Sequence, residues 1–216
     1  MLTLGIDTAT DVCAVAVLDD DRLLARSSLF VSRSHGTRLA MLIREQFAHA
    51  RKRPSDLEAV AVSSGPGSYT GLRIGMSTAK GLAVSTGCSF VAVPTLAALA
   101  HGCHGLVAVV LPSRRGEVYA AVYQDGLEVK PAAALEVDAV EEWLPSDLDA
   151  IGGPGAGRLG HVRPELARLS LVASGESVAR LGRSALEDGG PQDPATAEPV
   201  YLKAVAVSRP RGIFAP

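Results

Sequence analysis

The chain has 216 residues, 47% of them hydrophobic but only 4% aromatic, and its formal net charge is −2 at pH 7. This length suits one large domain or two small ones with enough apolar material for a core. The densest basic cluster, Arg51-Lys52-Arg53, is too short for a nucleic-acid platform and suits a helix C-terminus, so any contact with RNA is expected to need another protein.

The first half of the chain predicts the element order β-β-β-α-β-α. The turn Asp19-Asp20-Asp21 separates two β-prone runs, which indicates a hairpin. Ser34 is a plausible cap for a helix in which Leu39, Ile43 and Phe47 recur at helical spacing. The predicted segments are strands 2–6, 12–18 and 23–31, a helix 34–51, a strand 57–62, a helix 70–85 and a strand 90–93.

The second half repeats that order, with the turn Gln124-Asp125-Gly126 in its hairpin. The predicted segments are strands 106–111, 117–123 and 127–135, a short helix 137–144, strands 149–151 and 170–173, and a helix 177–186. Two such units predict an α/β fold of two tandem ribonuclease-H-like lobes, residues 1–104 and 105–216. The seam is expected near residues 101–105 as a ligand site, and residues 208–212 are expected to form a loose tail.

Three cysteines, Cys13, Cys88 and Cys103, are scattered and form no C-x-x-C motif. Such a set predicts a reduced protein of the cytoplasm without a disulfide framework. The first residues enter a strand pattern without a basic leader, and no apolar run is long enough to span a bilayer. We therefore expect neither a signal peptide nor a membrane segment.

The stretch GPGSYTGLRIG at residues 65–75 follows a strand and opens a helix, as a phosphate loop does. A Walker loop requires lysine where Leu72 stands, and a dinucleotide fingerprint requires a third glycine where Thr70 stands. Both nucleotide interpretations therefore fail. An anion contact at the helix N-terminus stays open, formed by Gly65, Gly67 and Ser68.

Small residues form a ridge along the helix that follows this loop, at Gly71, Gly75, Ala79 and Ala83. The only charged residues of that helix are Arg73 and Lys80, and apolar side chains occupy most of its circumference. Such a helix is expected to be buried on most sides. The pattern alone leaves two alternatives open, an internal core helix and a contact with another subunit.

The loop and its flanks, SSGPGSYTGLRIGMSTAKGLA, resemble the bacterial TsaB family. The pieces GIDTATDVCAVAV, RSHGTRLAMLI, RRGEVYAAVY and AEPVYLK agree in the same order. The resemblance implies the two-lobed fold of the actin, sugar-kinase and heat-shock-chaperone superfamily. It also implies a role in making threonylcarbamoyladenosine in tRNA, beside the catalytic sibling TsaD.

The resemblance implies that this chain lacks the metal centre of TsaD. That enzyme holds its metal with an H-x-x-x-H pair, and the corresponding positions here are Thr95 and Leu99. Leucine cannot ligate a metal, and one threonine hydroxyl does not replace a histidine. The nearby His101, Cys103 and His104 are interpreted as surface histidines and a small buried cysteine, because a short turn rarely aims three side chains at one ion.

The resemblance also argues against a nucleotide site between the lobes. Members that use ATP often carry an aspartate in each of two facing turns. In this chain the aspartate of the first turn is present as Asp7, followed by Thr8. Pro112 stands where the TsaB family commonly has the aspartate of the second turn. Arg114 and Arg115 remain candidates for a weak anion contact. Asp7 otherwise serves its own turn.

The resemblance therefore implies a catalytically silent subunit without a cofactor or metal of its own. Docking onto TsaD is expected through the two helices at 34–51 and 70–85, with a TsaE-type ATPase as a further partner, tRNA reached only through the complex, and a homodimer when the partner is missing. The expected interface residues are Arg38, Met41, Leu42, Glu45, Gly71, Arg73, Ile74, Gly75 and Ser77. Two rivals stay open: a stand-alone ATP-dependent enzyme of the superfamily, and a simple anion-binding module.

Overall fold

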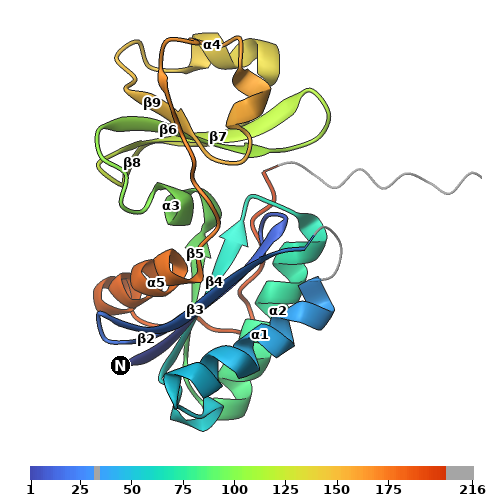
Figure 1. The fold of residues 1–216 in the computed structure, drawn as a ribbon, viewed down its shortest axis with the longest axis vertical. Coiled ribbons are helices and arrows are strands. Elements are labelled where there is room, and N and C mark those ends of the chain that lie inside the picture. The colour runs from blue at the N-terminus through green and yellow to red at the C-terminus, as the bar shows by residue number, and fades with distance from the viewer. Residues whose placement is uncertain (32–34, 203–216) are drawn as a thin grey trace, which may run out of the picture.

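The protein consists of two five-stranded sheets stacked along its long axis (Figure 1). The computed structural model describes residues 1–31 and 35–202. The first sheet has the order β3-β2-β1-β4-β5, in which β1 pairs antiparallel with β2 and parallel with β4. Its strands are β1 Leu2–Asp7, β2 Val12–Asp19, β3 Arg22–Phe30, β4 Ala59–Gly65 and β5 Ser89–Pro94.

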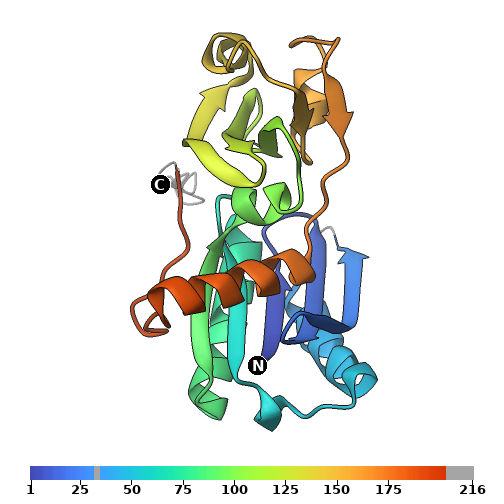
Figure 2. The ribbon, with the colours of Figure 1, turned by 90° about the vertical axis from the view of Figure 1, so that its left-hand side faces the viewer.

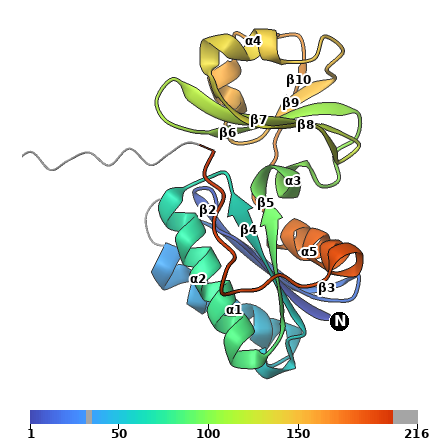
Figure 3. The same ribbon diagram turned by 180° about the vertical axis from the view of Figure 1, so that it is seen from behind.

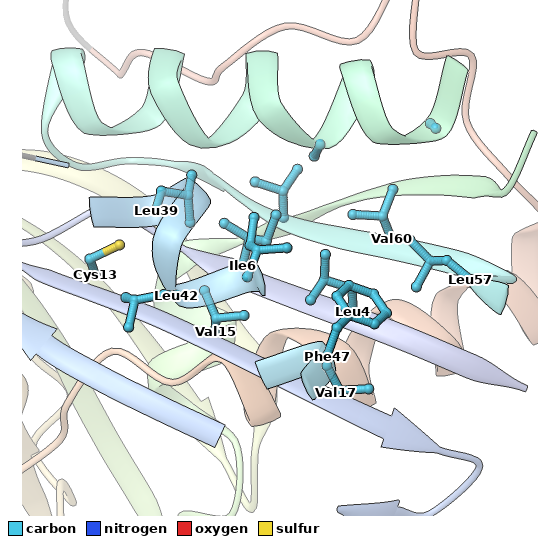
Figure 4. Close-up of a cluster of buried hydrophobic side chains, with 14 of the residues drawn as sticks. Leu4, Ile6, Cys13, Val15, Val17, Leu39, Leu42, Phe47, Leu57 and Val60 are labelled. Carbon is cyan, nitrogen blue, oxygen red and sulfur yellow. The ribbon is translucent and has the colours of Figure 1, made fainter. Parts of the chain in front are cut away.

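Helices α1, His35–Ala50, and α2, Tyr69–Thr86, cover one face of this sheet (Figure 1). Figure 4 shows side chains of α1, among them Leu39, Leu42 and Phe47, packed onto Ile6 and Val15 of the central strands. These side chains are spaced three to five residues apart on the inner face of α1, which explains why helical periodicity predicted the helix. The predicted elements of the first half are all present, with shifts of a few residues at their ends.

The small-residue ridge of α2 faces the sheet of its own lobe. A Cβ atom at Gly71 would lie 2.0 Å from the Thr8 carbonyl oxygen, and one at Gly75 would lie 2.2 Å from the Thr8 Oγ1. The Thr8 hydroxyl also donates to the Gly71 carbonyl at 2.8 Å. Of the two alternatives left open by the sequence, the glycines therefore serve an internal contact, and a bulky residue at Gly75 would test folding rather than docking.

The close approach at Gly71 gives a paired stability prediction. Gly71→Ala is expected to lower the free energy of unfolding by about 1 to 3 kcal/mol, because the added methyl group meets backbone that cannot move freely. At Gly81, on the exposed side of the same helix, a methyl group would meet no other part of the fold within 4 Å. Gly81→Ala is expected to raise stability by about 0.5 to 1 kcal/mol through helix propensity. Urea unfolding of both variants measures the opposite signs, and equal effects would contradict the packing described.

The second sheet has the order β10-β9-β6-β7-β8 and repeats the antiparallel hairpin of the first. Its strands are β6 Leu106–Pro112, β7 Glu117–Gln124, β8 Leu127–Glu136, β9 Ala150–Gly152 and β10 Ala167–Leu169. The expected short helix is a 3-10 turn, Val137–Ala139, followed by α4, Val140–Trp143. The strand expected at 170–173 is wrong, because β10 ends at Leu169 and the chain then leaves the sheet toward the other lobe.

A short helix, α3 Thr95–Ala100, joins the two lobes and was not predicted. Five of its six residues are buried, and Leu96 and Leu99 pack with Val107 and Leu111 of β6. A segment so short and so apolar carries no helical period, which is why its sequence could not be told from a linker. Helix α3 therefore joins the lobes through buried apolar contacts with β6.

Helix α5, Gly175–Gly189, belongs by sequence to the range expected to form the second lobe, yet it packs on β1, β2, β4 and β5 of the first sheet. Figure 2 shows it crossing the face opposite α1 and α2. Glu176 accepts from Arg180 at 2.9 Å and from Arg26 at 2.7 Å. Partial burial by itself would raise the pKa of Glu176, because it disfavours the charged carboxylate. The hydrogen bonds from Arg180 and Arg26 outweigh this effect and hold the pKa below its ordinary value. The lobe boundary between residues 104 and 105 stays a prediction. Helix α5 follows the second sheet in sequence but packs on the first.

Residues 190–202, which we call the C-terminal strap, run from the end of α5 around β5 and along α2 (Figure 3). The Gln192 N–H donates to the Phe90 carbonyl at 2.9 Å, and the Val200 N–H donates to the Ser64 carbonyl at 2.7 Å. The tail predicted around 208–212 lies outside the described residues. None of the helices described is long and apolar enough to cross a membrane.

Candidate docking face and interlobe cleft

An apolar groove lies between the outer surfaces of α1 and α2. Its volume is about 450 Å³, and Ile43, Phe47 and Leu82 contribute to its lining. Between it and the N-terminus of α2 lies a second hollow of about 580 Å³, lined in part by Ile74 and Thr78. We call the exposed surface around these two hollows the docking face. Its remaining lining residues are Gly36, Ala40, Arg44, Ala48, Lys52, Arg53, Pro54, Tyr69, Thr70, Arg73 and Ser77.

The structure sorts the expected interface residues into two groups. Arg38, Arg73 and Ser77 are exposed, and Met41, Glu45 and Ile74 are half-buried. For these six residues a role in docking stays a prediction. Small side chains on the exposed side, such as Ala40 and Ser77, leave room for a helix of another protein to approach.

The outward placement of Leu42, Gly71 and Gly75 is wrong. Leu42 is 1% exposed and packs into the core of the first lobe (Figure 4). Both glycines are buried against Thr8, as described above. A helical wheel shows which residues share a face, but it does not show which face meets the sheet.

An aromatic and cationic cluster occupies the end of the docking face at the start of α2. The Arg73 Nη1 donates to the Tyr69 hydroxyl at 2.6 Å, and the guanidinium carbon lies 5.4 Å from the centre of the Tyr69 ring. Tyr201 of the C-terminal strap brings its ring centre to 5.2 Å from that of Tyr69. Sequence reasoning missed Tyr201, because its position depends on the path of the strap.

A cleft of about 360 Å³ separates the lobes. Of the residues expected to contact an anion, Gly67, Ser68 and Arg114 line it, whereas Arg115 faces a separate hollow beside Val137. The other three, Asp7, Thr8 and Gly65, are buried beneath the loop. The structure therefore divides the predicted anion contacts, and a role for those in the cleft stays a prediction.

Two members of that set, the buried Asp7 and the exposed Ser68, stabilise the turn and the loop. Asp7 is 0% exposed, and its Oδ1 accepts from the Ala9 N–H at 3.0 Å, as in an aspartate turn. Ser68 caps α2 by accepting from the Gly71 N–H at 3.2 Å. These polar groups are engaged by the chain itself.

Arg158 holds the opposite lip of the cleft and was not identified from the sequence. Its Nη1 donates to three carbonyl oxygens, those of Ser113, Arg114 and Glu117, at 3.2, 2.8 and 2.7 Å. The side chain thus fixes the turn between β6 and β7 from the 3-10 turn Ala156–Leu159, beside the cleft. The glycine-rich stretch before it, residues 152–157, was the available signal.

The two positions aligned with metal ligands have structural roles here. Thr95 Oγ1 accepts from the Gly65 N–H at 3.0 Å, and Leu99 is buried in the contact between α3 and β6. Across the residues that the structure describes, no group of three or more His, Cys, Asp or Glu side chains lies close enough to hold a metal ion. In the nearby turn Cys103 is buried, whereas His101 and His104 are exposed, so the three do not converge.

Comparison with known sequences identifies related proteins. The family described as "TsaD: tRNA N6-adenosine threonylcarbamoyltransferase" matches residues 29–185. The tRNA threonylcarbamoyladenosine biosynthesis protein TsaB of Bacillus subtilis is 36% identical over 127 residues, which cover 57% of this chain and 56% of that protein. The match thus spans about half the length of this curated relative.

Solved structures extend the likeness over nearly the whole chain. YeaZ from Pseudomonas aeruginosa superposes with a TM-score of 0.82 at 29% identity, covering 93% of this chain and 99% of that one. Component A of the 2-hydroxyglutaryl-CoA dehydratase of Acidaminococcus fermentans has a TM-score of 0.54 at 10% identity, covering 87% of this chain and 98% of that one. The second likeness concerns the fold alone, and it confirms the predicted pair of ribonuclease-H-like lobes.

Proposed function

Because the chain belongs to the TsaD family, among its TsaB/YeaZ members, we propose that it is a non-catalytic partner subunit of the tRNA-modifying enzyme. It pairs with a TsaD-type catalytic subunit and supports transfer of the threonylcarbamoyl group to the adenosine beside the tRNA anticodon. Pairing places the docking face of α1 and α2 against the corresponding helices of the partner.

The exposed apolar groove between α1 and α2 is the observation that carries this proposal. Apolar side chains such as Ile43 and Leu82 contribute to a hollow of about 450 Å³, which Arg44, Lys52 and Arg53 also line. Contiguous apolar surface of this kind on a folded protein is typical of an interaction site. The small exposed residues beside it permit close helix packing, as a four-helix contact between two subunits requires.

The non-catalytic role is supported by the two positions where the catalytic sibling carries histidines. Thr95 is committed to holding the loop before α2, and Leu99 to the contact between the lobes. Neither side chain supplies the nitrogen ligands that a metal-dependent transfer needs. Metal and ATP therefore act in the partner subunits, the TsaD-type subunit and a TsaE-type ATPase.

The remaining associations follow from the same docking face. An apolar groove left bare in water favours pairing with a second copy, so the isolated chain forms a homodimer. tRNA is reached through the assembled complex. This chain contributes a surface and stability to the complex.

Co-expression with the TsaD-type subunit of the same organism tests the proposal. We expect the two chains to co-elute at equal stoichiometry in size-exclusion chromatography. The homodimer of this chain should disappear as the complex forms, because both use one face. Separate elution of the two folded chains at micromolar concentration would contradict the proposal.

The stand-alone ATP-dependent enzyme makes a different prediction. Asp7 is buried under its turn, and Pro112 adds neither charge nor an N–H donor at the other lip of the cleft. We expect isothermal titration of the purified chain with ATP and Mg²⁺ to show no dissociation constant below about 1 mM, equivalent to about −4 kcal/mol. Micromolar binding with turnover would favour the enzyme.

A further inference from the structure

Charge is distributed unevenly between the docking helices and the rest of the chain. The whole protein carries 21 basic and 23 acidic residues. The segments 35–53 and 69–86, which contain α1 and α2, carry only one acidic residue, Glu45. Their basic residues are Arg38, Arg44, Arg51, Lys52, Arg53, Arg73 and Lys80.

Most of this basic charge has no acidic counterpart on the protein itself. Lys52 pairs with Asp19 at 3.1 Å, and Arg53 pairs with Asp56 at 3.0 Å. Within residues 1–31 and 35–202, the structure shows no ion pair for the other five basic residues. Glu198 of the C-terminal strap borders the hollow beside Arg73 but forms no ion pair with it among the described contacts.

The apolar groove and the basic residues belong to one surface. Arg44 lines the groove and Arg73 lines the second hollow, both without an ion pair among the described residues. Lys52 and Arg53, which have their own acidic partners, complete the basic rim around Ile43 and Phe47. An apolar floor with a charged rim is the composition of a protein interface, in which the rim sets the partner's charge and the floor excludes water. RNA phosphates would use the basic rim. Among the described residues, the floor offers no exposed aromatic face on which a base could stack, because Phe47, its aromatic residue, is only 2% exposed.

We propose that the occupant of the docking face is a protein surface of acidic, amphipathic helices, and that rim charge distinguishes this partner from a second copy of the chain. The inference rests on the proposed function and specifies its partner. A second copy would bring the same basic rim against itself, which repels. Pairing with the acidic partner and self-pairing therefore respond to salt in opposite directions.

Salt dependence of the two associations tests this directly. Raising NaCl from about 0.1 M to about 0.5 M shortens the screening length by about half. We expect the dissociation constant of the complex with the TsaD-type subunit to rise at least about tenfold, or about 1.4 kcal/mol. Over the same range the dissociation constant of the homodimer should fall. Analytical ultracentrifugation measures both.

A charge reversal at the rim identifies the side chain involved. Arg44→Glu is expected to slow association with the TsaD-type subunit by about tenfold at low salt while changing the dissociation rate less, because rim charges act mainly on encounter. Arg22→Glu is the matched control, since Arg22 is exposed on β3 and the substitution changes the net charge equally. Its association rate should stay within about twofold of the unaltered chain.

The outcomes separate the two proposals. A complex that forms equally well at both salt concentrations overturns the acidic-partner inference and leaves the partner-subunit function standing. Absence of a complex at either concentration overturns both. If Arg44→Glu weakens binding of tRNA to the isolated chain and leaves the protein complex unchanged, the rim serves RNA and the inference is wrong.

Discussion

Ser77→Trp is expected to weaken the complex with the TsaD-type subunit at least about 100-fold, or about 2.7 kcal/mol. Ser77 is exposed in the middle of α2 and lines the hollow shared with Ile74. Helices that pack face to face lie about 8 to 10 Å apart, and an indole at the contact holds them further apart. The loss follows from geometry, because the substitution adds no charge.

Ser184→Trp provides the control for this experiment. Ser184 is exposed on α5, on the opposite face of the first sheet. The same substitution there should leave the affinity for the partner within about twofold, while both variants keep the circular dichroism of the unaltered chain. An equal loss in both variants, or none in Ser77→Trp, would place the partner on another surface.

Gly175→Leu is expected to cost at least about 3 kcal/mol of stability, the upper range for overpacking. A Cβ atom at Gly175 would lie 2.5 Å from the Ala16 backbone nitrogen and 2.6 Å from the Val15 carbonyl carbon. Facing it, a Cβ atom at Gly5 would lie 1.9 Å from the Gly175 carbonyl oxygen. The helix cannot retreat without exposing Val178 and Ala179, which are buried on the sheet.

The expected fall in melting temperature is about 6 to 12 °C for a chain of this size. At Gly189, at the end of the same helix, a Cβ atom would meet no other part of the fold within 4 Å. Gly189→Leu should therefore leave the melting temperature within about 2 °C. A small change in Gly175→Leu would mean that α5 does not seal the first sheet as described.

Local patterns predicted the first lobe well because its elements carry a clear period. Leu39, Ile43 and Phe47 mark the inner face of α1, and the glycine loop marks the start of α2. The same patterns could not assign α5 to a sheet. Its place on the first sheet depends on long-range contacts, among them the one between Gly5 and Gly175, which are 170 residues apart.

The sequence pointed to the two helices that carry the candidate docking face, but it misplaced or missed some of the individual residues. The helices of the docking face were predicted, but Leu42 and the two glycines of α2 belong to the core of the lobe. Arg158 and Tyr201 escaped detection because their partners lie far away in sequence, at residues 113–117 and at Tyr69. Long-range contacts of this kind leave no local period.

The central claim is that this chain acts through association and performs no transfer itself. Reconstitution of tRNA modification from purified subunits tests it most directly, with the TsaD-type subunit, the TsaE-type ATPase, tRNA and the threonylcarbamoyl adenylate. We expect modification by the full set to fall at least about tenfold when this chain is omitted, and no modification by this chain alone. Transfer by the rigorously purified chain without the other subunits would contradict the account.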